Sequence, residues 1–320
     1  MADSETHGSA PPRFLPLAAL LTGNAALALG PWLVRLADTG PVSAAFWRLF
    51  IAIPFLAMLA LANRQPLGGM GRGTLVALAA GGAFFAFDLA SWHVGIELTR
   101  LANATLFGNA GSVVLMAWAF VALRQWPRGR EGLAIVAALA GAAILLGRSM
   151  DIAASNLAGD LFCLLAGLLY AGYLLILQGK RATLGGWALL TWSSIFAASV
   201  LLPLALFRRE PLWPGDWTPV VLLAFSSQLI GQGLLVYSLR HFSTLAIGVA
   251  LLTQPAIAAL VGWYVFAETL VPLDIAGMVL LASALAIAKS ATPRVRAASP
   301  ALSTDAPAGD SQSDISRGRT

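Results

Sequence analysis

One carboxylate lies inside an apolar stretch where it could bind a cation or carry a proton. The stretch AFFAFDLASWHVG, residues 83–95, places Asp88 among Phe, Ala and Leu, with Trp92 and His93 about one helical turn further on. Ser91 and Trp92 follow Asp88 at the i+3 and i+4 positions of a helix, so they share its face. We expect that face to line a polar, aromatic cavity. Asp88 and His93 are the candidate proton-coupling residues, although a lone histidine near a helix end also fits a hydrogen-bonded packing role.

The composition sets these residues in a membrane. Of the 320 residues, 58% are hydrophobic and 11% are charged, and the mean hydropathy is +0.78. Soluble domains carry about 25% charged residues, so this chain is predicted to be an all-α integral membrane protein. The net charge of +5 does not indicate nucleic-acid binding, because the basic residues lie between apolar runs and not along one face. The single Cys163 provides no disulfide framework.

The apolar residues form stretches of the length that spans a bilayer. A membrane helix needs about 20 predominantly apolar residues. Ten such stretches are expected, at 15–36, 42–62, 74–96, 101–123, 131–147, 158–178, 186–207, 217–238, 243–266 and 271–289. The segments outside them, 1–13 and 291–320, are rich in Pro, Ser, Ala and charge, and we expect both to be disordered tails.

The distribution of Lys and Arg predicts the orientation. Fourteen of the 20 basic residues fall in one set of loops and ends, and five fall in the opposite set. Because cytoplasmic loops carry the excess of Lys and Arg, both termini are predicted to be cytoplasmic. Termini on the same side require an even number of spans, which agrees with ten.

A second charged residue lies at the depth of Asp88. Counted along the helix axis, Arg48 lies about 9 Å and Asp88 about 12 Å below the outer ends of their helices. A charge at the centre of a bilayer costs roughly 2.5–3.5 kcal/mol on insertion scales, so such groups usually pair or face a water-filled cavity. We therefore expect Arg48 and Asp88 to interact, directly or through water. A structural clamp between two helices and a contact with substrate both remain open.

The order of elements repeats along the chain. The hairpin that begins LANATLFGNAGSVV resembles in pattern the later segment that begins FSTLAIGVALLTQPA, and a Gly/Ala-rich helix follows each. Five spans per half is an odd number, so the second half must enter the membrane upside down. The predicted halves are residues 14–148 and 149–290. Inverted repeats are a common plan for secondary transporters, which bind their cargo at mid-membrane between the repeats.

Four segments carry a resemblance to a known family. These are LLTGNAALALGPWLVRLADTGPVSAAFWRLFIAIPFL, FFAFDLASWHVGIELTRLANATLFGNAGSVV, GDLFCLLAGLLYAGYLLIL and SSQLIGQGLLVYSLRHFSTLAIGVALLTQPAIAALVGW. Together they resemble the ten-helix drug/metabolite transporter superfamily with tandem EamA-type repeats, in its amino-acid and metabolite exporter branch. The resemblance implies an exporter in a bacterial cytoplasmic (inner) membrane. The chain departs from the family in the first helix, where Thr22-Gly23-Asn24 replaces a Trp-Gly pair, and in the last hairpin, where FAETL replaces a Gly-Glu pair.

Further polar residues gather near mid-depth. In hydrocarbon each unsatisfied amide would cost several kcal/mol, so these side chains need partners in the bundle or water. Hydrogen bonding between helices explains any one of them, whereas the whole set predicts a central cavity. The predicted substrate-binding residues are Asn24, Arg48, Asp88, Trp92, Asn109, Tyr170, Gln228, Gln232 and Gln254.

The charges of this predicted cavity favour a small zwitterion. Phosphorylated cargo would need several basic residues, and Arg48 is the basic residue within the spans. A lipophilic cation would favour a carboxylate without a nearby base. Export of amino acids or similar polar metabolites is therefore predicted, with a multidrug or lipophilic-cation exporter and a channel-like facilitator as alternatives. Coupling to protons and the oligomeric state stay open, and a monomer is compatible with the sequence.

No catalytic constellation is apparent. The three histidines are dispersed and the carboxylates are unpaired, so neither an enzyme, a metal site nor a cofactor is predicted.

Overall fold

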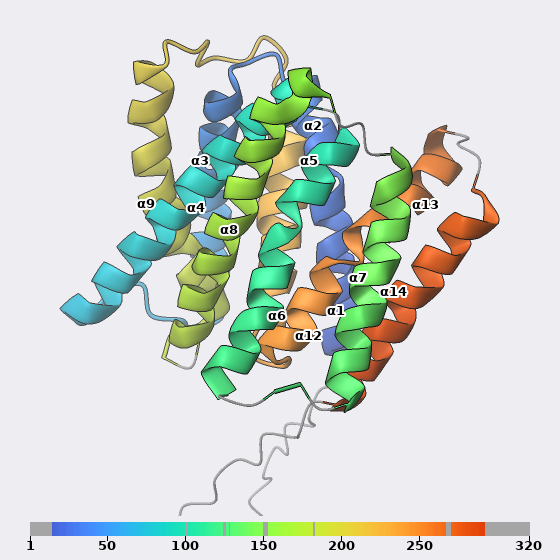
Figure 1. Cartoon of the computed structure of the whole chain (residues 1–320). Coiled ribbons are helices and arrows are strands. Elements are labelled where there is room, and N and C mark those ends of the chain that lie inside the picture. Colours follow the sequence, from blue (N-terminus) through green and yellow to red (C-terminus); the bar gives the residue numbers. More distant parts are fainter. Residues whose placement is uncertain are drawn as a thin grey trace, which may run out of the picture.

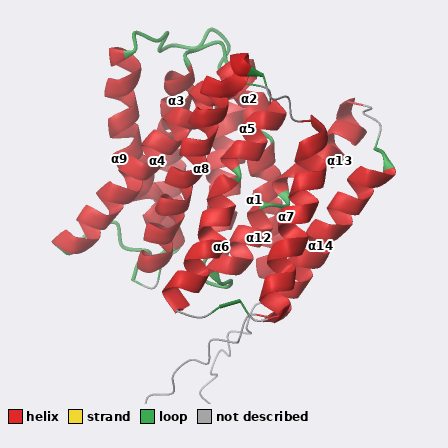
Figure 2. Ribbon diagram, viewed as in Figure 1, coloured by secondary structure: helices red, strands yellow, loops and turns green. Residues whose placement is uncertain are grey.

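The computed structural model describes residues 15–99, 101–123, 126–127, 129–149, 153–181, 183–266 and 270–291. These residues fold as helices joined by short loops, and no strand occurs among them (Figure 2). The predicted tails lie outside this part of the chain, apart from Ala291, which ends the last helix. The α-helices are α1 (Leu15–Ala28), α2 (Gly30–Leu36), α3 (Pro41–Ala62), α4 (Arg72–Leu98), α5 (Leu101–Gly108), α6 (Ala110–Leu123), α7 (Gly129–Ser149), α8 (Leu157–Lys180), α9 (Gly186–Phe207), α10 (Thr218–Leu223), α11 (Gly233–Ser238), α12 (Thr244–Leu251), α13 (Gln254–Phe266) and α14 (Pro272–Ala291). A 3₁₀ turn, η1 (Ala154–Asn156), precedes α8, and a π-helical segment, η2 (Ala224–Gln232), joins α10 to α11.

All ten stretches predicted from hydropathy are helical in the structure. Seven helical segments of the described chain are long and apolar enough to cross a membrane, and two further apolar helices are shorter. Large apolar side chains such as Met58, Leu61, Val76 and Val121 are exposed on the outer surface of the bundle. Exposure of so many apolar side chains to water is unfavourable, so this surface is suited to contact with lipid. The chain is a multi-pass membrane protein.

Small residues set the closest helix contacts. α4 packs against α8 and α9, α3 packs against α9, and α7 packs against α14. A Cβ added at Gly95 of α4 would lie 2.5 Å from the Cys163 sulfur of α8, and one at Gly141 of α7 would lie 2.7 Å from the Gly277 carbonyl oxygen of α14. Glycine therefore brings these backbones together, as is common between membrane helices. Figure 1 shows α9 at one edge of the bundle and α14 at the other.

Four of the predicted stretches contain breaks or distortions. A single non-helical residue separates α1 from α2 and α5 from α6, two residues separate α12 from α13, and η2 winds as a π-helix between α10 and α11. Pro31 and Pro255 lie just after two of the breaks, whereas Pro54 and Pro203 lie inside the continuous helices α3 and α9. Proline therefore does not interrupt the helix at Pro54 or Pro203. A membrane helix tolerates an internal proline where neighbouring helices satisfy the freed backbone groups.

Candidate functional site

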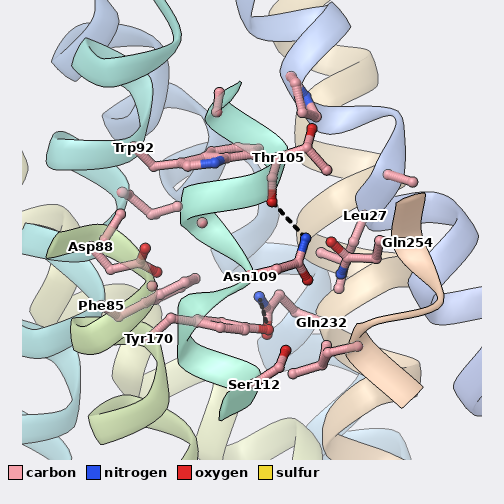
Figure 3. A pocket seen from close by; sticks show the side chains of 18 of the residues that line it. Leu27, Phe85, Asp88, Trp92, Thr105, Asn109, Ser112, Tyr170, Gln232 and Gln254 are labelled. Atoms are coloured by element: carbon pink, nitrogen blue, oxygen red, sulfur yellow. Dashed lines mark hydrogen bonds between the residues drawn. The ribbon is translucent and has the colours of Figure 1, made fainter. Parts of the chain in front are cut away.

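A cavity of about 100 Å³ lies among the interrupted helices (Figure 3). Its walls come from α1, α2, α3, α4, α5, α6, α8, η2, α12 and α13. Both halves of the chain, residues 14–148 and 149–290, therefore contribute residues to the cavity. The lining residues are Leu27, Ala28, Pro31, Arg48, Phe85, Asp88, Leu89, Trp92, Ala104, Thr105, Gly108, Asn109, Ser112, Ala166, Gly167, Tyr170, Gln232, Leu251 and Gln254.

Arg48 and Asp88 both line this cavity without forming an ion pair. Arg48 is 2% exposed and Asp88 is 6% exposed, and each lies in the electrostatic field of the other. The Nε of Arg48 is buried and has no hydrogen-bond partner among the described residues. Both residues border the same space, and an interaction between them through water stays a prediction. A direct clamp between them does not form.

Five other residues predicted to bind substrate also line the cavity: Trp92, Asn109, Tyr170, Gln232 and Gln254. Gln232 Nε2 donates a hydrogen bond to Tyr170 Oη at 3.0 Å, which joins η2 to α8. Asn109 Nδ2 donates to the carbonyl oxygen of Thr105 at 2.7 Å. Figure 3 shows these two hydrogen bonds, with the Asp88 carboxylate and the Trp92 indole on the α4 side. The site thus presents both charges and amides to one small volume.

Trp92 packs closely against two glycines, Gly30 and Gly108. A Cβ at Gly30 would lie 3.1 Å from the indole ring, and one at Gly108 would lie 3.3 Å from its Nε1. Contacts this short are tighter than ordinary van der Waals packing. Glycine at these two positions therefore lets the ring lie between α2 and α5, on the helical face that also carries Asp88.

Two predicted residues lie outside the lining and hold helices together. Asn24 Nδ2 donates to the Ala250 carbonyl oxygen at 2.6 Å, which ties α1 to α12. Gln228 Nε2 donates to Ser194 Oγ at 3.1 Å, which ties η2 to α9. These contacts fit the interhelical role that the sequence also allowed, because an amide buried in a bundle must find a partner. A role for either residue in substrate binding remains a prediction.

His93 is also separate from the cavity lining. It is fully buried in α4, and its ring packs edge-on against that of Trp92 with centroids 5.7 Å apart. Its position fits the packing role better than a role as a proton relay, because it lies off the cavity lining and packs against an aromatic ring. Proton coupling through either residue remains a prediction.

Asn109 and Gln254 lie at helix breaks. Asn109 separates α5 from α6, and Gln254 is the first residue of α13, after the break at Leu252 and Thr253. Short-range bonds mark both turns: Ser112 N–H donates to the Asn109 carbonyl at 2.9 Å, and Thr253 N–H donates to the Ala250 carbonyl at 3.0 Å. Broken helices place backbone N–H and carbonyl groups at membrane depth, and this arrangement is tolerated where it lines a cavity.

The sequence did not single out Thr105, Ser112 or Phe85 as binding residues, although they line the cavity. Thr105 lies four residues before Asn109 and Ser112 three residues after it, so helical spacing from Asn109 could have identified both. Phe85 stacks on Tyr173 at 4.3 Å and forms an apolar part of the wall. No comparable signal marks Phe85, because phenylalanine is frequent throughout the chain.

No group of three or more His, Cys, Asp or Glu side chains that could hold a metal occurs in the described part of the chain. Cys163 is buried in α8 against Gly95. The cavity can offer ionic contacts and hydrogen bonds through the charged and polar side chains that line it.

A bundle of apolar helices around a small charged and polar cavity defines a membrane transport protein. The EamA-like transporter family matches the chain twice, over residues 15–147 and 157–289. The chain therefore belongs to the EamA-like transporter family, which confirms the resemblance seen in the sequence. Its members are transporters and not enzymes.

Individual relatives show more distant similarity. The threonine/homoserine exporter RhtA of Escherichia coli strain K12 is 31% identical over 165 residues, which cover 51% of this chain and 54% of RhtA. RhtA of strain O157:H7 matches equally well. The match thus spans about half the length of these relatives. One solved crystal structure superposes with a TM-score of 0.71 over 89% of this chain and 100% of that chain, at 15% identity. That likeness shows the fold alone.

Proposed function

We propose that this protein is a secondary transporter that exports small zwitterionic metabolites, most of all amino acids, by alternating access around the Arg48–Asp88 cavity. One observation carries the proposal: two opposite charges line one buried cavity without pairing with each other. An unpaired buried charge is costly, so the site is suited to a ligand that supplies both missing partners. A zwitterion brings a carboxylate for Arg48 and an ammonium group for Asp88. The similarity to a threonine/homoserine exporter supports the same substrate class.

The helix breaks add partners for both ends of a zwitterion. α6 and α13 begin beside the cavity, and helix N-termini favour an anion. Pro31 and Pro255 have no N–H, so they cannot bond the carbonyls of Leu27 and Leu251, which belong to cavity-lining residues. Carbonyls released in this way can accept hydrogen bonds from an ammonium group.

Competition in liposomes tests this assignment. The purified chain is reconstituted with unlabelled threonine inside, and uptake of labelled threonine is measured against outside competitors. Threonine should compete at least about tenfold better than its amino alcohol, which lacks the carboxylate, and its hydroxy acid, which lacks the ammonium group. Equal competition by the amino alcohol would favour the lipophilic-cation alternative and contradict the proposal.

Proton coupling is part of the proposal and is tested separately. A proton entering along a membrane potential releases about 2.3 kcal/mol per 100 mV, which is enough to drive export, and Asp88 is the proposed coupling site. Accumulation driven by an imposed pH difference should be lost in Asp88→Asn. Transport by this variant that still responds to the pH difference would remove Asp88 from the coupling step.

The proposed topology has ten crossings in two inverted repeats, residues 14–148 and 149–290, with both ends in the cytoplasm of a bacterial cell. The excess of Lys and Arg in one set of loops supports it. It is also supported by the ends of the bundle, because α1 begins and α14 ends at the same end in Figure 1.

A further inference from the structure

The helices α3 and α9 cap each other's first turns. Glu210, which follows α9, accepts hydrogen bonds through Oε2 from Val42 N–H at 2.8 Å and Ser43 N–H at 3.0 Å, in the first turn of α3. Its Oε1 accepts from Arg208 Nε at 2.7 Å. The first N–H groups of a helix have no partner within the helix, so this carboxylate satisfies two of them. We call this contact the Glu210 latch.

A second latch closes the other end of the pair. Gln65, which follows α3, accepts a hydrogen bond through Oε1 from Ala188 N–H at 3.0 Å, in the first turn of α9. The chain that leaves α9 thus caps the start of α3, and the chain that leaves α3 caps the start of α9. The two helices therefore run antiparallel, and the latches lie at opposite ends of the pair. We call this contact the Gln65 latch.

The two latches are related residue by residue. The segments LALANRQPL, residues 59–67, and LALFRREPL, residues 204–212, share Leu, Ala, Leu, Arg, Pro and Leu at equal places. Arg64 and Arg209 precede the latch residues with φ of 53° and 56°. A left-handed backbone conformation is uncommon for arginine, and its occurrence in both segments shows that the two turns have the same backbone geometry.

Glycine makes room for both latches. Gly40 and Gly185 cap α3 and α9, and a Cβ there would lie 2.4 Å from the Glu210 Cβ and 1.9 Å from the Gln65 Cδ. The interval from Gly40 to Gly185 equals that from Gln65 to Glu210. A local two-fold relation therefore links the two ends of the α3–α9 pair.

Each latch is reinforced by a tryptophan. Trp47 Nε1 donates to the Leu212 carbonyl at 2.6 Å beside the Glu210 latch, and Trp192 Nε1 donates to the Leu67 carbonyl at 3.2 Å beside the Gln65 latch. Trp47 directly precedes Arg48 in α3. The Glu210 latch therefore fixes the helix segment that carries the cavity arginine.

We propose that Glu210 and Gln65 are paired positioning residues for transport, each holding one end of the α3–α9 pair closed in alternation. The proposal rests on the proposed function, because alternation matters only to a carrier. Opening the pair at one end breaks the latch at that end and favours the closed state of the latch at the other end. The latches differ in chemistry: the carboxylate makes charge-assisted hydrogen bonds and the amide makes a neutral one, so the Glu210 end is held more firmly. The resting protein therefore favours closure at the Glu210 end.

Hydrogen exchange of the reconstituted full chain tests the coupling between the ends. In Glu210→Gln, the amides of Val42 and Ser43 should exchange roughly three- to tenfold faster, as expected from loss of a charge at a helix N-terminus. The amide of Ala188 at the far end should exchange more slowly, because the population shifts toward closure there. In Gln65→Glu, protection should rise at Ala188 and fall at Val42 and Ser43.

The far-end change separates positioning from simple capping. A cap that is merely structural alters exchange at its own end only, and that result in both variants would overturn the proposal. Exchanging the residues in Gln65→Glu/Glu210→Gln should reverse which end is better protected. Asp216→Asn is the matched control, because Asp216 is an exposed acid in the same loop whose side chain accepts from Thr218 N–H and touches neither latch.

The exchange measurement needs no substrate, so the two proposals fail independently. Coupled exchange without threonine counterflow would retain the positioning role and reject the substrate assignment. Robust counterflow with uncoupled ends would do the opposite.

Discussion

Asn109 and Gln254 line the same cavity, and each lies at a break in its helix. The sequence interval between them equals the interval that separates Gln65 from Glu210. Asn109 follows α5 and Gln254 begins α13, so corresponding places in the two family-matched segments supply one amide each. The two repeats therefore build the cavity from equivalent positions, next to Arg48 and Asp88.

Removing either amide should weaken transport without unfolding the protein. Asn109→Ala and Gln254→Ala are each expected to reduce the apparent affinity for threonine about tenfold, because a hydrogen bond to a charged group is worth roughly 1.5–3 kcal/mol. Counterflow at varied threonine concentration measures the effect. Asn63→Ala is the control, since Asn63 is exposed and bonds only to Leu59 of its own helix. An unchanged affinity in both cavity variants would contradict a binding role.

Arg48 should matter for function and not for stability. Its Nε has no partner, so Arg48→Gln is expected to leave the midpoint of thermal unfolding unchanged or raise it, while transport is lost. Arg35 is the comparison, because its Nη2 donates to the carbonyls of Ile96 at 3.0 Å and Thr99 at 2.5 Å. Arg35→Gln should lower the stability by roughly 1–3 kcal/mol. Equal destabilisation by both variants would mean that Arg48 is a structural clamp.

Replacing Gly167 of α8 by a larger residue is predicted to lower the stability of the protein. An added Cβ would lie 2.6 Å from the Gly108 carbonyl oxygen and 3.0 Å from the Gly111 nitrogen. Gly167→Ala should therefore push α8 away from α5 and α6, at a cost of roughly 1–3 kcal/mol. Gly179→Ala in the same helix meets nothing within 4 Å, and it should be neutral or slightly stabilising. Thermal unfolding in detergent compares the two, and the prediction fails if Gly167→Ala unfolds at the wild-type temperature.

His241 should contribute a pH-dependent part of the stability. It lies in the turn between α11 and α12, where partial burial and the charges of Arg240 and Arg181 lower its pKa. The unfolded chain therefore takes up a proton near pH 6.5 that the folded protein resists, so stability is full above this pH and falls as the pH drops below it. The unfolding midpoint of His241→Asn should fall less between pH 7 and pH 5 than that of the wild type. An equal fall of the unfolding midpoint in the variant and the wild type would show that His241 does not contribute to the pH dependence of stability.

The helices were predictable because the bilayer demands long apolar runs, and all ten expected stretches are helical. The breaks at Asn109 and Thr253 were not, because a single turn of altered hydrogen bonding leaves no change in hydropathy. Proline alone was a poor guide, since Pro54 lies in a continuous helix and Pro255 lies at a break. The effect of a proline depends on what its neighbours can bond.

The same division holds for the cavity. Arg48 and Asp88 could be identified because a charge in hydrocarbon is costly and needs a partner or a polar cavity. Trp92 could be identified from its i+4 spacing to Asp88. Asn24 and Gln228 have the same residue types as the lining amides, yet they bond to Ala250 and Ser194. Which way a helix turns its polar face is set by packing against the other helices, and hydropathy does not contain this information.

The sequence by itself determined a multi-pass helical transporter with Arg48 and Asp88 as charges deep within its apolar stretches, because the cost of polar groups in lipid is a local property of the chain. Tertiary structure alone decided that Arg48 and Asp88 share a cavity without pairing, and that α3 and α9 cap each other's first turns. Those relations join residues far apart in sequence, and their distances depend on how closely glycine lets the helices approach.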